Sequence, residues 1–238
     1  MTGPLATLKN RLLSALPSED KGLIAPHLSA VELEKGRLLY DPGDVIDQVY
    51  FPNDCVISLM TLMESGAAIE SATIGREGAL GLMAAVAPRQ SLSRAIVQAP
   101  GSSLRIAAAP LHDAWKRSAA LRDLVDRHNE ALFGHAIQSV ACNALHAVEA
   151  RFCRWLLSCQ DRIDSNTVHL TQEFLADMMG VQRTTVTAVA GSMQAKGLIS
   201  YRRGIVEILD RAGLEAMACE CYGAVRRGYQ RLLPASFA

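Results

Sequence analysis

The stretch that decides the fold is residues 170–200, which read LTQEFLADMMGVQRTTVTAVAGSMQAKGLIS. Thr171 is a good N-cap for a first helix, because its hydroxyl can accept a hydrogen bond from a free backbone N–H of the first turn. Ala176, Gly180 and Val186 follow at the offsets that two steeply crossing helices require. The small side chain lets the backbones approach, the glycine makes the turn with a positive φ, and the branched side chain fills the shared core. The stretch therefore predicts a helix-turn-helix.

The exposed face of the second helix carries side chains that suit contacts with DNA. The N-terminal residues of such a helix enter the major groove. There Arg183 could offer two donors to guanine and Gln182 could pair with adenine. Threonines can contact a phosphate or a thymine methyl group, and the start of the preceding helix can donate to phosphate. The candidate DNA-binding residues of the two helices are Thr171, Gln172, Gln182, Arg183, Thr184 and Thr187.

A hairpin is expected directly after these helices. Two strand-like runs flank Arg202, Arg203 and Gly204, which predicts a wing with two arginines at its tip, placed for the DNA backbone. The whole chain is balanced, with 24 basic and 24 acidic residues. Between Gly180 and Glu207, however, every ionised side chain is basic. Local positive charge on a balanced chain suits a protein that touches phosphates over a small footprint.

The region from about Val31 to Ile106 has the texture of short strands. Apolar clusters alternate with turn residues, and short helices precede the region. This pattern predicts a small antiparallel barrel or sandwich. The clusters are residues 38–40, 49–51, 56–59 and 95–97, and the turns include residues 35–36, 41–44, 52–54, 65–66 and 99–101.

A long helical stretch follows, opened by Pro110. Apolar residues, with some small or polar residues among them, recur along it with an alternating spacing of four and three residues. This spacing is typical of a helix that pairs with a second copy of itself. The alternative, a helix packed against its own barrel, stays open. The residues with this spacing are Leu124, His128, Ala131, His135, Gln138, Cys142 and Leu145. We expect three parts: an effector-type domain with N-terminal helices (1–118), a dimerisation helix (119–146) and a DNA-binding domain (147–238).

The sequence predicts neither a cofactor nor a metal. The six cysteines have no framework spacing, and Cys219 and Cys221 alone supply two ligands, too few for a zinc site. His128 and His135 lie two helical turns apart and could bind a metal or haem or sense pH, but buried hydrogen-bonded histidines are the more common case. The common catalytic motifs are missing, so we expect no enzymatic activity. The chain has neither a membrane span nor a signal-peptide core, so we expect a cytoplasmic protein with no membrane partner.

The sequence resembles the Crp/Fnr family of bacterial transcription regulators. Gly180-Val181-Gln182-Arg183-Thr184-Thr185-Val186 is similar to the family's G-x-S-R-E-T-V pattern, with Arg183 at the recognition arginine. Thr184 replaces the usual glutamate, and Ala188 stands at the position of a second arginine in the catabolite activator protein. The resemblance implies an α+β fold: an N-terminal antiparallel β-roll of jelly-roll type, a long dimerisation helix and a C-terminal winged helix-turn-helix. It also implies a DNA site different from that of the catabolite activator protein.

The resemblance also identifies a degenerate effector pocket. Cyclic-nucleotide binders of the family carry G-E-L, whose glutamate holds the ribose hydroxyl, and R-S-A, whose arginine holds the cyclic phosphate. This chain has Ala79 in the glutamate's place, and its Ser93-Arg94 order is exchanged, so the arginine would face the opposite side of the strand. We therefore expect no productive cyclic-AMP binding. The pocket positions are Gly78, Ala79, Gly81, Ser93 and Arg94.

These features together predict a homodimeric, sequence-specific transcription regulator on a pseudo-palindromic DNA site. Its partners would be double-stranded DNA and a second copy of the chain, with RNA polymerase as a further candidate. The effector would be an unknown small molecule, or none. The alternative is a β-roll regulatory module whose helical tail binds a protein partner.

Overall fold

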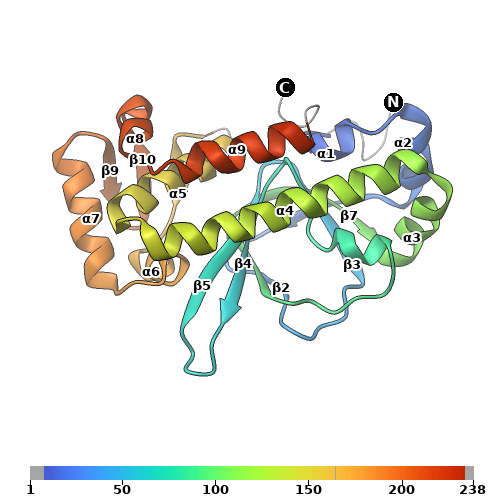
Figure 1. Cartoon of the computed structure of the whole chain (residues 1–238), viewed down its shortest axis with the longest axis horizontal. Helices are drawn as coiled ribbons and strands as arrows, with labels where there is room; N and C mark the ends of the chain where they lie inside the picture. Colours follow the sequence, from blue (N-terminus) through green and yellow to red (C-terminus); the bar gives the residue numbers. More distant parts are fainter. Residues whose placement is uncertain (1–7, 164, 234–238) are drawn as a thin grey trace.

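The computed structural model describes residues 8–163 and 165–233, and its N-terminal half is built on two antiparallel sheets (Figure 1). One sheet has the strand order β1-β7-β3, and the other has the order β2-β6-β4-β5. This confirms the predicted antiparallel β-roll. The strands are β1 (Ser29–Leu33), β2 (Leu38–Tyr40), β3 (Gln48–Pro52), β4 (Val56–Leu62), β5 (Ala68–Ile74), β6 (Arg94–Ala99) and β7 (Gly101–Ala107).

Short helices cover one end of the β-roll. The buried side chain of Asn10 accepts from Leu13 N, which caps the first helix, and donates to the carbonyls of Pro52 and Gly78 at 2.8 and 2.9 Å. One amide thus ties the N-terminal segment to two loops of the roll. The helices here are α1 (Arg11–Ser14), α2 (Ser18–Ile24), and the 3-10 turns η2 (Ala25–His27) and η3 (Leu82–Ala85).

Two helices follow the β-roll, α3 (Ala108–Arg117) and the long α4 (Ala119–Leu145). Ser118 separates them, because its hydroxyl accepts from Leu121 N at 2.8 Å and so starts a new helix. In Figure 1, α4 crosses the front of the sheets. The sequence predicted a long helical stretch from Pro110 with a dimerisation helix from residue 119, and the structure begins α3 at Ala108 and α4 at Ala119.

The spacing predicted for pairing of α4 mostly marks a face that is buried inside the chain. Leu124, His128, Ala131, His135 and Cys142 are each no more than 5% exposed. His128 packs against the β-roll, as the open alternative has it, whereas His135 and Cys142 contact Tyr229 and Cys219 near the C-terminus. A different face of α4 is exposed, and its apolar side chains are Phe133, Ile137 and Val140.

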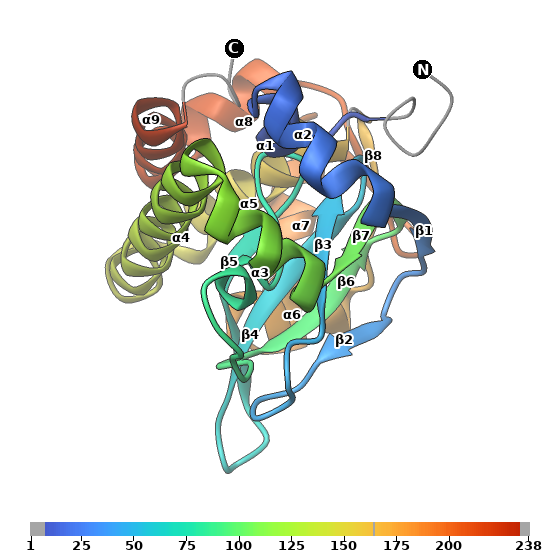
Figure 2. The same ribbon diagram turned by 90° about the vertical axis from the view of Figure 1, so that its right-hand side faces the viewer.

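The C-terminal third has its own buried core, built on helices and a small sheet of order β8-β10-β9. In both ribbon views α9 runs alongside α4, so the last helix returns to the long helix (Figures 1 and 2). Among the described residues, no helix combines the length and apolar character that a membrane span requires. The elements are α5 (Val148–Ile163), β8 (Thr167–His169), α6 (Gln172–Met179), α7 (Arg183–Ala195), β9 (Ile199–Arg202), β10 (Ile205–Ile208), α8 (Arg211–Met217) and α9 (Cys221–Leu232).

Candidate nucleic-acid interface

The helix-turn-helix is formed by α6 and α7. Thr171 caps α6, with its hydroxyl accepting from Phe174 N at 3.2 Å. Gly180 ends α6 with φ 61° and ψ 41°, the left-handed conformation that favours glycine. Ala176 and Val186 are buried between the helices. The cap, the turn and the shared core are therefore as the sequence predicted.

The N-terminal part of α7 points away from this core. Gln182, Arg183, Thr184 and Thr187 are all exposed. Because α7 begins at Arg183, the free N–H groups of its first turn lie at the same end of the helix as Gln182, Arg183 and Thr184. The arrangement presents one cation and three uncharged polar groups at the positive end of a helix dipole.

A surface pocket joins this helix to its neighbours. It is lined by residues from the start of α6, from α7 and from the hairpin. Thr187 Oγ1 lies within hydrogen-bond distance of Gln172 Oε1 at 2.9 Å, which holds the two helices in register here. Glu173 adds one carboxylate to the rim. The predicted residues that the pocket brings together are Thr171, Gln172, Arg183, Thr187 and Arg203.

The wing is a hairpin of β9 and β10 with a two-residue turn. Arg203 and Gly204 form the turn, with φ values of 51° and 78°, and both values are typical of the tight hairpin turn that follows strand twist. Arg202 and Arg203 are exposed at the tip. Tyr201 Oη donates to the carbonyl of Leu170 at 2.9 Å and so fixes the wing against the entry to α6. The sequence missed the third strand of this sheet, β8, which is only three residues long.

The effector-pocket positions 78 and 79 are covered by α4. The N–H of Ala79 donates to His128 Nε2 at 3.1 Å, and a Cβ at Gly78 would lie 2.8 Å from the same nitrogen. Burial lowers the pKa of His128 to about 4 and also lowers the pKa of His135, so both imidazoles are neutral near pH 7. The lone pair of His128 Nε2 is used inside the protein, which does not favour the metal or haem interpretation of this histidine.

The charged residue of the predicted pocket, Arg94, is in an ion pair. Arg94 donates to both carboxylate oxygens of Asp41, at 2.7 and 2.9 Å. Its neighbour in β6, Ala95, is buried, so Arg94 lies on the opposite face of the strand. Ser93 precedes the strand, and its carbonyl accepts from Ser91 Oγ at 2.7 Å. Gly81 has φ 81° and starts η3. None of these contacts leaves Arg94 directed at the Ala79 loop.

The sequence also missed a cluster that assembles around Cys219 and Cys221. The structure brings Cys142 and His146 to the same place, so that four possible ligand atoms lie within 4.8 Å of one another. The prediction that no metal is bound considered Cys219 and Cys221 as a pair of ligands without Cys142 and His146. Because the other two residues come from 73 to 79 positions earlier in the chain, no local spacing could have indicated them.

Comparisons with known proteins agree with this architecture. Residues 150–217 match the family model of the Crp-like helix-turn-helix domain. The solved structure of FixK2 from Bradyrhizobium japonicum superimposes with a TM-score of 0.69 at 14% identity, covering 81% of this chain and 98% of that one. A Crp/Fnr-family transcriptional regulator from Thermus thermophilus gives 0.64 at 20% identity, covering 80% and 98%. The c-di-GMP responsive regulator CLP from Xanthomonas campestris gives 0.64 at 14%, covering 82% and 100%. A comparison with curated protein sequences finds no match.

Proposed function

We propose that this chain, which carries a Crp-like helix-turn-helix domain on a fold of the Crp/Fnr type, is a sequence-specific DNA-binding transcription regulator. The observation that carries the proposal is the exposed start of α7, where Arg183 lines one pocket with Arg203 of the wing and is in no ion pair among the described residues. In this proposal residues 1–118 receive a signal, residues 119–146 dimerise and residues 147–238 bind DNA. The protein-partner alternative has no observation in its favour.

The roles of the residues follow from their places in the interface. Arg183 would reach the edge of a guanine with two donors, and Gln182 and Thr184 would contact neighbouring bases. Thr187 would lie at the edge of the DNA groove, together with Thr171 and Gln172 at the start of α6. Arg202 and Arg203 would contact the phosphate backbone of the same half-site.

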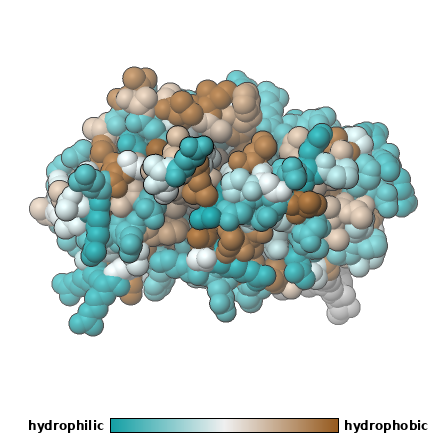
Figure 3. Space-filling view, turned by 90° about the horizontal axis from the view of Figure 1, so that it is seen from below, coloured by the Kyte–Doolittle hydropathy of each residue, from teal (hydrophilic) through white to brown (hydrophobic). Residues whose placement is uncertain are grey.

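A second copy of the chain would pair through the exposed face of α4. Phe133, Ile137 and Val140 are 68%, 55% and 71% exposed, and they succeed one another at helical spacing. Figure 3 looks at the molecule from below, and hydrophobic side chains gather along its upper edge, where the front of Figure 1 lies. Two copies related by a two-fold axis would present two winged helix-turn-helix domains (residues 147–238, the reading heads) to a pseudo-palindromic site.

We further propose that cyclic AMP is not the signal. Ala79 offers no carboxylate for a ribose hydroxyl, its N–H is bonded to His128, and Arg94 is bonded to Asp41. A cyclic phosphate would have to displace Asp41 from Arg94. Arg94 also lies on the face of β6 opposite to the buried Ala95. The effector is therefore another small molecule, or the β-roll has lost its effector.

The test is selection of bound fragments from a genomic DNA library by the purified protein, with and without cyclic AMP. We expect a two-fold symmetric motif that is recovered equally in both conditions, and binding that weakens steeply with salt because several phosphates are contacted. Failure to enrich any motif at low salt would refute the proposed DNA binding. A motif recovered only with cyclic AMP would refute the proposed independence from that nucleotide.

A further inference from the structure

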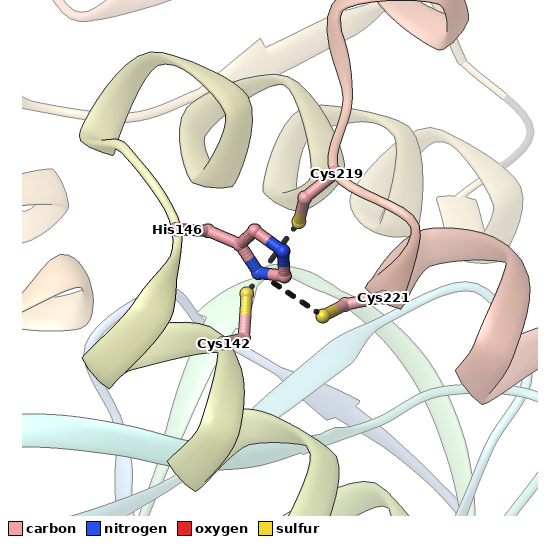
Figure 4. A group of neighbouring side chains, drawn as sticks. All are labelled: Cys142, His146, Cys219 and Cys221. Carbon is pink, nitrogen blue, oxygen red and sulfur yellow. Dashed lines mark hydrogen bonds between the residues drawn. The ribbon is translucent and has the colours of Figure 1, made fainter.

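Four side chains converge where α4 ends and α9 begins (Figure 4). Cys142 Sγ lies 3.5 Å from Cys219 Sγ, and Cys221 Sγ lies 3.4 Å from His146 Nδ1. All four ligand atoms are within 4.8 Å of one another. The three cysteines are at most 8% exposed, so the sulfur atoms meet in a protected place.

We infer that Cys142, His146, Cys219 and Cys221 form a zinc-binding site of the Cys₃His type. Zinc in structural sites takes four ligands at tetrahedral positions, with Zn–S near 2.3 Å and Zn–N near 2.0–2.1 Å. Those bond lengths place two sulfur ligands about 3.8 Å apart and a sulfur and a nitrogen about 3.6 Å apart. The observed separations of 3.5 and 3.4 Å are close to both values. These two separations therefore suit one shared ion, and the remaining separations among the four atoms are at most 4.8 Å.

The groups around the cluster support the same assignment. With Nδ1 directed at the sulfurs, His146 Nε2 lies 3.8 Å from Glu220 Oε1, and a carboxylate on the far nitrogen is the usual partner of a metal-bound histidine. Gln138 Nε2 donates to Cys221 Sγ at 3.0 Å, a contact that favours a thiolate. The backbone N–H of Cys219 donates to Ala150, which anchors the loop between α8 and α9 to α5.

The site joins parts of the chain with different proposed tasks. Cys142 and His146 belong to the end of α4, and His146 is the residue at which that helix stops with extended backbone angles. Cys219 and Cys221 lie in the junction of α8 and α9, beyond the winged helix in sequence. An ion here would bind the long helix to the last helices and limit motion at residues 146–147, between α4 and the reading head. This part of the inference rests on the proposed function.

Metal binding is tested on the full chain, first without DNA. Protein is purified under reducing conditions, stripped with a chelator and titrated with Co²⁺ and then Zn²⁺. We expect one ion per chain, visible d–d bands and a thiolate-to-cobalt charge-transfer band that zinc removes. Zinc at about a thousand times the Kd should raise the Tm by roughly 10 °C.

Variants separate this site from other thiols. Cys142→Ser and Cys219→Ser should lose the charge-transfer band, whereas Cys55→Ser, a buried cysteine in the β-roll, should keep it. Glu220→Gln, at an exposed position, should weaken zinc binding by about tenfold. The His146 side chain is 25% exposed, and His146→Ala should lose metal affinity while the Tm of the stripped protein stays near that of stripped wild type. The inference is overturned if stripped wild-type protein binds no more cobalt than Cys142→Ser. Iron with acid-labile sulfide, or a Cys142–Cys219 disulfide in protein prepared without air, would overturn it as well.

The hinge role is tested with the DNA site recovered by selection. Zinc-loaded protein should bind this site at least about tenfold more tightly than stripped protein, because fewer arrangements of the reading head compete. Equal affinity in both forms would overturn the hinge role. If neither form binds DNA while cobalt still binds at one ion per chain, the proposed function fails and the metal site stands.

Discussion

Arg183 is the single side chain on which the proposed base readout depends most. It is exposed at the first position of α7. Replacing it with alanine should cost roughly 1–3 kcal/mol of binding at the selected site and relax the preference at one base pair. The measurement is fluorescence anisotropy on the selected duplex and on duplexes that carry each alternative base at that position.

Arg203 offers the matched comparison, because it lies in the turn of the wing and would contact phosphate. Arg203→Ala should weaken binding to all duplexes by a similar factor and make the salt dependence shallower. If Arg183→Ala also weakened random and selected DNA equally, its assignment as a base reader would be wrong.

Gly180 carries a second prediction at the residue scale. Its φ of 61° is unfavourable for a residue with a side chain, and a Cβ there would lie 2.8 Å from Ile69 Cδ1. Gly180→Ala should lower the free energy of unfolding by about 1–2 kcal/mol for the backbone alone, measured by urea denaturation. Ile69→Val in the same chain should recover part of any further loss, since it removes the contacting methyl group.

Gly191 is the control for this substitution. It lies inside α7, and a Cβ there would meet nothing within 4 Å. Gly191→Ala should therefore stabilise the chain by about 0.5–1 kcal/mol, because alanine is the better helix former. A loss of stability from Gly191→Ala as large as that from Gly180→Ala would show that the turn geometry is not the cause.

At the scale of elements, the spacing of residues predicted the features that depend on near neighbours in the sequence. The cap at Thr171, the turn at Gly180 and the wing were all predicted, because each depends on residues within a few positions of one another. The exposed face of α4 was not predicted, because the helix is apolar on two sides. Spacing alone cannot tell which of the two sides packs against the rest of the chain. His128 and His135 fitted a pairing pattern but are buried against the β-roll and α9.

The exposed side of α4 gives the prediction at this scale. Ile137→Asp should convert a dimer into a monomer, since it places a charge in an apolar interface without a partner. DNA affinity should fall by about 10²–10⁴-fold, because the two half-sites would be bound independently. Sedimentation equilibrium measures the change from dimer to monomer, and fluorescence anisotropy measures the loss of DNA affinity.

Leu92 provides the matched control for the dimer interface. It is 97% exposed, apolar and located in the loop before β6 of the β-roll. Leu92→Asp should leave both the mass in solution and the DNA affinity unchanged. A wild-type chain that sediments as a monomer at micromolar concentration would contradict the proposed dimer.

At the scale of the whole molecule, the two halves are joined by polar contacts that no sequence pattern indicated. Lys35 Nζ donates to the carbonyl of His169 at 2.6 Å, and Gln98 Nε2 donates to Cys159 Sγ at 3.2 Å. Trp155 Nε1 of α5 donates to Glu70 of β5 at 3.1 Å. These pairs are 61 to 134 positions apart, so only the folded chain brings them together. These contacts join the β-roll to the C-terminal third of the chain.

Glu70 is buried in this junction, where burial and its hydrogen bonds act on its pKa in opposite directions. Ser58 Oγ lies 2.7 Å from Glu70 Oε2 and 2.8 Å from Gln98 Oε1. The Ser58 hydroxyl donates to Glu70, and Trp155 Nε1 donates to the other carboxylate oxygen, so both hydrogen bonds stabilise the carboxylate. Burial raises the pKa of Glu70 to about 7, against the opposing effects of the Ser58 and Trp155 hydrogen bonds and of Arg154 and Arg162.

The last prediction follows from this raised pKa. Because the folded chain holds the proton of Glu70 more tightly than the unfolded chain, whose pKa is near 4.5, the stability from this group is complete below pH 4.5. It is lost as the pH rises to about 7, by roughly 3 kcal/mol in total. Glu70→Gln keeps the size of the side chain and one acceptor oxygen without the titration, so its stability relative to wild type should grow over that interval. Urea unfolding of both chains at pH 5, 6, 7 and 8 measures this difference, and subtraction removes the opposite contributions of His128 and His135. A constant difference across the series would show that Glu70 is ionised in the folded protein and that the junction is held as a carboxylate.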